Sequence, residues 1–141
     1  MTFERALTVA KGNSEAALFL VEHFTFCKLL DDVIDEPGSV TDERLVKDTL
    51  CYLAVLCNPG WAKDNSERLF PMMVTAANTW LDSNRLCRSE DKRLVLASEV
   101  LKNQCDEMER FVACACGGMG HMREISKDRQ FDFDLTPKEG I

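Results

Sequence analysis

No apolar run in the 141-residue sequence approaches the length of a membrane span. The longest uninterrupted stretches, such as Ala16 to Val21, are far shorter than the roughly 20 residues that a spanning helix requires. The first residues also lack the basic start, the apolar middle and the small-residue cleavage site of a secretory signal. We therefore expect a cytoplasmic protein with no membrane-embedded part.

Basic side chains are fewer than acidic ones: the sequence has 17 Lys and Arg and 24 Asp and Glu, which gives a net charge of -7. Binding to phosphate backbones and to anionic lipid depends on Lys and Arg clusters, and the sequence has none. Direct nucleic-acid binding is therefore not expected. An acidic surface of this kind suits contact with a basic surface on another protein instead.

Motifs of several common enzyme classes are missing as well. No serine, histidine and aspartate set stands in a nucleophile-elbow context, and no phosphate-binding glycine loop follows a strand pattern. His23 lies beside an apolar helical stripe, near Phe19 and Phe26. This position predicts a partly buried, hydrogen-bonded histidine rather than a general base.

Strand signals are scarce, whereas apolar residues recur at spacings of three and four in several long windows. The pattern predicts an all-α fold, in which four main helices pack as an antiparallel bundle because their connections are short. The first runs from the Gly12-Asn13-Ser14 break to Pro37-Gly38, the second from Ser39-Val40-Thr41-Asp42 to Asn58-Pro59-Gly60, the third from Asn65 or Ser66 to about Ser83, and the fourth from Ser89 to about Ala115, before Gly117-Gly118.

Shorter helices are expected at both ends of this bundle, one over Thr2 to Ala10 and one further turn around His121. No repeat, low-complexity run or linker divides the chain. We therefore expect a single helical-bundle domain over residues 1–126. The segment 127–141 mixes charges with phenylalanines, which predicts a loosely ordered tail or one that docks on a partner.

Seven cysteines form an odd set, and most lie within apolar helical patterns. A reduced thiol in such a pattern behaves as a small hydrophobe, so we expect core cysteines rather than a disulfide framework. Cys114 and Cys116, with His121 downstream, lack the two-residue spacer that is usual in structural zinc sites.

Three carboxylates gather near the end of the first main helix. Asp31 lies on the apolar stripe of that helix, four residues before Asp35, and Asp32 lies three residues before Asp35. Like charges at these spacings, at the C-terminal end of a helix, are destabilising, so something should compensate them. A hard divalent cation such as Mg²⁺ would do so, and so would Lys28, a basic side chain from elsewhere, or exposure to solvent.

The residues Leu30-Asp31-Asp32-Val33-Ile34-Asp35-Glu36 resemble the first aspartate-rich motif, DDxxD, of class I isoprenoid synthases. The resemblance implies that Asp31, Asp32 and Asp35 bind Mg²⁺, which would hold a diphosphate and assist the departure of pyrophosphate. Because the chain is short for such an enzyme, a homo-oligomer would supply the missing wall of the site. Candidate ligands on the second side of the site are the pairs Asn78 with Asp82 and Asn103 with Glu107, although either pair could simply be a surface pair. Candidate phosphate contacts are Lys28 and Arg123.

A second resemblance covers more of the chain and is carried by short motifs in a fixed order. These are Gly12-Asn13, Asp31-Asp32, Asn58-Pro59, Asn78 with Asp82-Ser83, Gly117-Gly118, Met122-Arg123 and Ile125-Ser126. In this order they resemble small helical proteins of unknown function encoded by tailed bacteriophages. The resemblance implies a viral origin and a place in the cytoplasm of the host cell.

Two functions from different classes follow from these patterns. The first is a Mg²⁺ site for a diphosphate on the aspartate-rich helix, with or without catalysis. The second is a noncatalytic accessory protein that binds a viral or host protein through its acidic surface or its C-terminal tail. All-α nucleotide pyrophosphohydrolases are a further enzyme alternative, although the acids Glu22, Asp32, Asp35, Glu43 and Asp48 do not reproduce their paired spacing.

Overall fold

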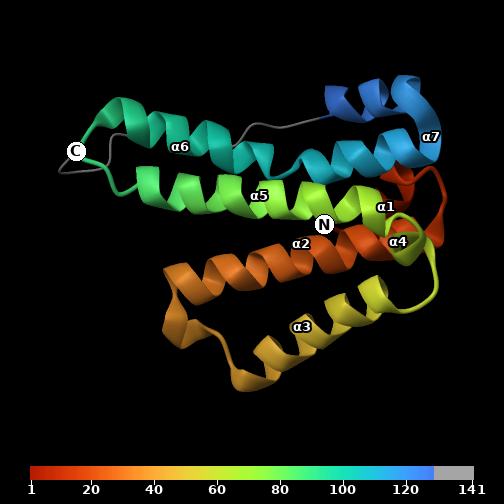
Figure 1. Cartoon of the computed structure of the whole chain (residues 1–141), viewed down its shortest axis with the longest axis horizontal. Coiled ribbons are helices and arrows are strands. Elements are labelled where there is room, and N and C mark those ends of the chain that lie inside the picture. The colour runs from red at the N-terminus through yellow and green to blue at the C-terminus, as the bar shows by residue number, and fades with distance from the viewer. Residues whose placement is uncertain (129–141) are drawn as a thin grey trace.

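The computed structural model describes residues 1–128, and every regular element in that part of the chain is helical (Figure 1). The elements are α1 (Phe3–Val9), α2 (Ser14–Asp35), the 3-10 helix η1 (Pro37–Ser39), α3 (Asp42–Cys57), α4 (Trp61–Asp64), α5 (Ser66–Leu86), α6 (Lys92–Gln104) and α7 (Glu107–Lys127). The predicted all-α fold is confirmed. From residue 129 onward, the predicted tail lies outside the described residues.

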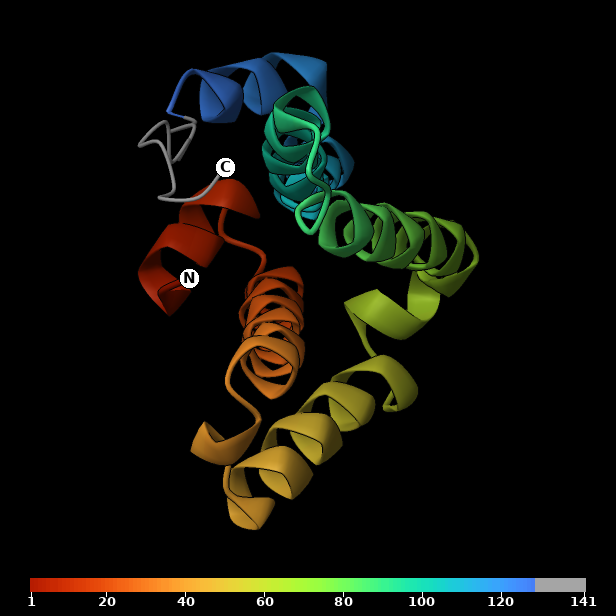
Figure 2. The same cartoon turned by 90° about the vertical axis from the view of Figure 1, so that its left-hand side faces the viewer.

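Two helix pairs make up most of the bundle. Helix α2 packs along α3, and α5 packs along α6, as Figure 1 shows. Helix α1 covers the start of α2, α7 contacts both α1 and α2, and the short α4 contacts α2, α3 and α5. Figure 2, turned by 90°, views α2 and α5 nearly end-on, with α3 beside α2 and α6 beside α5. Contacts of α4 with α2, α3 and α5, and of α7 with α1 and α2, join the two pairs.

Side-chain caps explain where the first main helices begin. The Asn13 Oδ1 atom accepts a hydrogen bond from the Ala16 backbone N–H at 3.1 Å, which confirms one of the two predicted caps of α2. Helix α3 is capped by Thr41, whose Oγ1 accepts from the Arg44 N–H at 3.1 Å. Ser39, the start of the predicted signal, lies in η1 instead.

The connection between the second and third predicted helices contains the short helix α4, which the sequence patterns did not predict. Four residues are too few to establish a 3.6-residue period. The backbone N–H of Trp61 donates to Glu15 Oε2 at 2.6 Å, so a carboxylate from the first turn of α2 fixes the start of α4. This contact holds the connection between the two helix pairs.

The prediction of one continuous fourth helix, from Ser89 to about Ala115, is wrong. Helix α6 ends at Gln104 and α7 begins at Glu107. Between them the N–H groups of Cys105 and Asp106 donate to carbonyls three residues earlier, and no glycine or proline marks the step. The break lets α6 stay against α5 while α7 packs on α1 and α2, which one straight helix would not do.

The predicted glycine break at Gly117-Gly118 is confirmed, because the backbone at Gly118 has φ 82° and ψ 178°, a non-helical conformation that glycine adopts far more readily than other residues. Helix α7 therefore consists of two helical segments joined by a kink, and the second runs to Lys127, further than the one turn expected around His121. Beyond the bend, the imidazole Nε2–H of His121 donates to the Val9 carbonyl at 2.8 Å. The second half of α7 is therefore anchored to the end of α1.

Replacing Gly118 by alanine is expected to lower the free energy of unfolding by about 2 kcal/mol, because an L side chain is strained at this φ and ψ. A Cβ atom added at Gly118 meets no atom within 4 Å, so the loss of stability would reflect backbone strain alone. Urea unfolding followed by circular dichroism measures it. The control is Gly120→Ala in the same helix, where a Cβ also meets nothing and stability should stay level or rise. Equal effects of the two changes would contradict the argument.

The buried core draws on α1, α2, α5 and α7, with Tyr52 from α3 and Ala62 from α4. Its largest fully buried side chains are Val9, Phe19, Leu20, Leu29, Leu69 and Val112. The seven cysteines are free thiols, as expected. The prediction that they lie in the core is wrong for Cys57, Cys87 and Cys114, which are exposed. The other four are half-buried, and Cys116 packs against the core.

Candidate functional site

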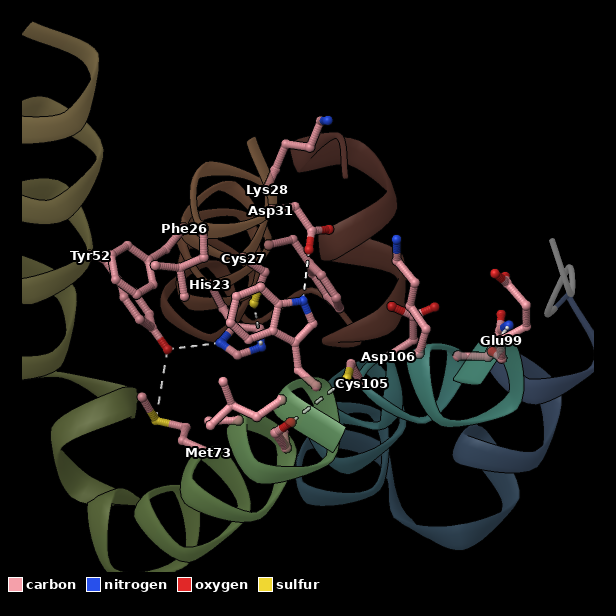
Figure 3. Close-up of a pocket in the computed structure, with 18 residues that line it drawn as sticks. His23, Phe26, Cys27, Lys28, Asp31, Tyr52, Met73, Glu99, Cys105 and Asp106 are labelled. Carbon is pink, nitrogen blue, oxygen red and sulfur yellow. Dashed lines mark hydrogen bonds between the residues drawn. The ribbon is translucent and has the colours of Figure 1, made fainter. Parts of the chain in front are cut away.

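A pocket of about 740 Å³ lies where the two helix pairs stand apart (Figure 3). Helices α2 and α3 supply one side, and α5, α6 and the step before α7 supply the other. Most of its wall is apolar and includes Phe24, Phe26, Met73, Ala76, Ala77 and Leu81. A cavity of this size and lining is typical of sites for small molecules.

His23 forms part of the deep wall, where it is 6% exposed. Its Nδ1 lies 2.8 Å from the Tyr52 hydroxyl, and its Nε2 lies 3.6 Å from the Cys27 Sγ. The Tyr52 oxygen also lies 3.7 Å from the Met73 Sδ, and Figure 3 shows this chain of contacts. Burial lowers the pKa of His23 from 6.5 to about 4, so the ring is neutral at pH 7. The expected buried, hydrogen-bonded histidine is confirmed.

Two cysteines line the pocket, Cys27 from α2 and Cys105 from the step between α6 and α7. Burial raises the pKa of Cys27 to about 12, and negative charge on Cys105, Asp31 and Asp106 adds to the rise. Burial also raises the pKa of Cys105, with further contributions from Asp106 and Asp31. Both are therefore neutral thiols at pH 7 rather than nucleophilic thiolates.

Of the three predicted aspartates, Asp31 is the one that lines the pocket. Its place on the apolar stripe of α2 turns it inward, as the spacing indicated. The indole Nε1–H of Trp80 donates to Asp31 Oδ1 at 2.7 Å, a bond that Figure 3 shows between α2 and α5. This bond connects α5 to the aspartate-rich end of α2.

The other two aspartates point elsewhere. Asp32 accepts from Lys28 Nζ at 2.6 Å and from Arg44 on α3, whose NH1 lies 2.8 Å away, and these two cations hold its pKa below the ordinary value. Asp35 is exposed at the end of α2. Basic side chains and an indole thus compensate the crowded charges, which is one of the alternatives that the sequence left open.

The three aspartates consequently have three different surroundings. Within residues 1–128, no group of three or more His, Cys, Asp or Glu side chains is placed to hold a metal ion. Binding of Mg²⁺ by Asp31, Asp32 and Asp35 stays a prediction from the resemblance. The contacts described here give it no added support.

The remaining predicted residues are scattered over the helices. Asn78 is exposed on α5, and Asp82 lies 3.6 Å from Arg85 on the same helix. Glu107 pairs with Arg110 at 3.1 Å, and Arg123 is exposed on α7. None of the four predicted residues, Asn78, Asp82, Glu107 and Arg123, is among the described residues that line the pocket, whereas Lys28 and Asn103 are.

Charged residues line one part of the pocket. Besides Lys28 and Asp31 of α2, they are Glu99 and Lys102 of α6 and Asp106 of the following step. Sequence reasoning did not single out Glu99, Lys102 or Asp106, because their alignment with Asp31 depends on how α6 is placed across the bundle. The step at residues 105–106, which brings Asp106 to the pocket, has no signal in the sequence.

Comparison with protein-family models, with curated proteins and with solved structures gave no match. In the part of the chain that the structure describes, no helix is both long and apolar enough to cross a bilayer. The site therefore has to be interpreted from its own geometry.

Proposed function

We propose that the protein binds a small molecule with an extended apolar body in the pocket between the α2/α3 and α5/α6 pairs. The observation that carries this proposal is the pocket itself, about 740 Å³ of mainly apolar volume with a few polar groups along one part of the wall. Sites for small organic ligands have this size range and this mixture of apolar surface with a few orienting polar groups.

The chemistry of the wall supports binding rather than covalent catalysis. The two thiols that line the pocket have raised pKa values, so they supply little thiolate at pH 7. Both nitrogens of His23 face partners, the Tyr52 hydroxyl and the Cys27 sulfur. A histidine held in this way serves to shape and close the wall.

The test is the binding of a neutral apolar fluorophore, N-phenyl-1-naphthylamine, whose emission rises when it leaves water. We expect saturable binding of one molecule per chain. Ala76→Phe, which places a ring in the pocket wall, should weaken this binding about tenfold or more by filling the volume that the probe needs. The matched control is Ala54→Phe, the same change at an exposed position of α3 outside the pocket lining.

Circular dichroism and urea unfolding of both variants separate loss of the pocket from loss of the fold. Binding that is weakened equally by Ala54→Phe and Ala76→Phe would place the probe elsewhere and contradict the proposal. Absence of saturable probe binding to the unmodified protein, or bound probe that 1-decanol does not displace, would do the same.

The other hypotheses rest on different observations, although Asp31 and Lys28 of the predicted diphosphate site also line this pocket. A diphosphate site with Mg²⁺, a homo-oligomer, and a protein partner bound through the acidic surface or the tail all stay predictions. Each rests on the sequence patterns described above, and none is required for the pocket to bind a ligand.

A further inference from the structure

The negative charge of Asp31 is the first observation that bears on the class of ligand. Its described hydrogen bond is to the Trp80 indole, a neutral donor, and within residues 1–128 no basic side chain lies within ion-pair distance of its carboxylate. The Lys28 ammonium attracts Asp31 more weakly, because its hydrogen bond is to Asp32. Asp32, one residue on, is bonded to both Lys28 and Arg44. A half-buried carboxylate facing a pocket without a cationic partner favours a positively charged ligand.

The basic side chains near the pocket do not reverse this preference. The ammonium of Lys28 is 2.6 Å from Asp32, and Figure 3 shows Lys28 directed away from the His23 and Cys27 side of the pocket. Lys102 is the second basic residue of the lining, against the carboxylates of Asp31 and Glu99. With a net charge of -7 for the whole chain, the pocket repels an anionic head group and attracts a cationic one.

Aromatic rings supply a second attraction for a cation. The ring of Trp80 lines the pocket while its N–H is bonded to Asp31, so the carboxylate and the indole adjoin the same space. Tyr52 and Phe26, with ring centroids 5.0 Å apart, line the pocket as well. An ammonium group near the face of an indole or phenol ring is attracted by the ring quadrupole, and tryptophan gives the strongest attraction.

We propose that the ligand of this pocket is an amphipathic organic cation, whose primary or quaternary ammonium head lies beside Asp31 and Trp80 and whose apolar chain extends along the Phe26 and Met73 side. This proposal rests on the proposed function, since it names the chemical class of ligand for the same pocket. It involves no covalent step and needs no metal ion.

The experiment compares four ligands with the same ten-carbon chain: decyltrimethylammonium, decylammonium, 1-decanol and decanoate. Each displaces N-phenyl-1-naphthylamine from the full chain at pH 7, below the concentration at which the ligand forms micelles. The two ammonium compounds should displace the probe at about tenfold lower concentration than 1-decanol, and decanoate should be the weakest.

Two charge-neutralising variants on one helix then locate the head group. Asp31→Asn keeps an oxygen acceptor for the Trp80 N–H and should reduce the preference for ammonium over 1-decanol about tenfold, with 1-decanol itself unchanged. Asp35→Asn removes the same charge from an exposed position outside the pocket lining and should leave the preference unchanged.

Two outcomes overturn the inference. Equal displacement by ammonium, alcohol and carboxylate shows that the pocket does not select charge, and equal losses in Asp31→Asn and Asp35→Asn show that only the overall charge of the protein matters. Either result leaves the proposed function standing, provided that 1-decanol displaces the probe. Failure of the probe and of 1-decanol to bind is the separate result that removes the proposed function.

Discussion

Replacement of Phe19 by alanine is expected to lower the free energy of unfolding by about 3–5 kcal/mol, the largest effect of any change proposed for this protein. The Phe19 side chain is fully buried on α2. Its ring centroid lies 5.6 Å from that of Trp61 and 6.4 Å from that of Tyr52. Truncation would leave a cavity that joins α2, α3 and α4, where rigid aromatic neighbours allow little collapse.

Urea unfolding measured by circular dichroism tests this prediction, and Phe70→Ala is its matched control. Phe70 lies on α5 with 68% of its surface exposed, so the same change there should alter stability by less than about 0.5 kcal/mol. If Phe19→Ala proves as mild as Phe70→Ala, the aromatic cluster around α4 does not stabilise the fold as described. The pocket proposal would survive that result, because Phe19 is not part of the pocket lining.

The stability of the protein is expected to fall by about 3 kcal/mol between pH 7 and pH 4 through the single side chain of His23. Burial lowers the pKa of His23 from 6.5 to about 4 in the folded state. The unfolded chain therefore binds a proton below pH 6.5 that the folded chain takes up only near pH 4. Since the unfolded state binds more protons in this window, stability decreases as the pH falls through it.

Urea unfolding of the unmodified protein and of His23→Gln at pH 7, 6, 5 and 4 isolates this contribution. Glutamine can still hydrogen-bond to the Tyr52 hydroxyl but does not titrate, while the carboxylates are common to both proteins. The stability of the unmodified protein, measured relative to that of His23→Gln, should fall by about 3 kcal/mol between pH 7 and pH 4. A difference that is constant across the series would show that His23 is protonated as readily in the folded as in the unfolded chain.

The helices could largely be predicted because their signals are local. Asn13 ahead of an apolar stripe, and Asn58-Pro59-Gly60 after another, start and stop α2 and α3 through backbone chemistry that acts within a few residues. The step at Cys105 and Asp106 could not be predicted in this way. Its cause is tertiary, because α6 packs on α5 and α7 packs on α1 and α2, while the local sequence remains compatible with one helix.

The candidate site was predictable to a smaller extent. Periodicity alone placed Asp31 on the inward stripe of α2, and the structure places it in the pocket wall. The partners of the aspartates come from other helices, Arg44 from α3 and Trp80 from α5. Their contacts depend on the rotation of each helix about its axis, which a hydrophobic stripe defines only to within about one residue position. The sequence therefore identified Asp31 as a residue of interest but did not identify the residues that surround it.

The hydrogen bond between Trp80 and Asp31 gives the protein a natural optical reporter. It joins α2 to α5 across the space between the helix pairs, so widening that space separates the donor from the acceptor. An indole that loses a carboxylate partner and gains water emits at longer wavelength, whereas one that becomes covered by an apolar chain emits at shorter wavelength. The colour of the Trp80 emission, read in a Trp61→Phe background, would therefore distinguish an opened pocket from a filled one without any added dye.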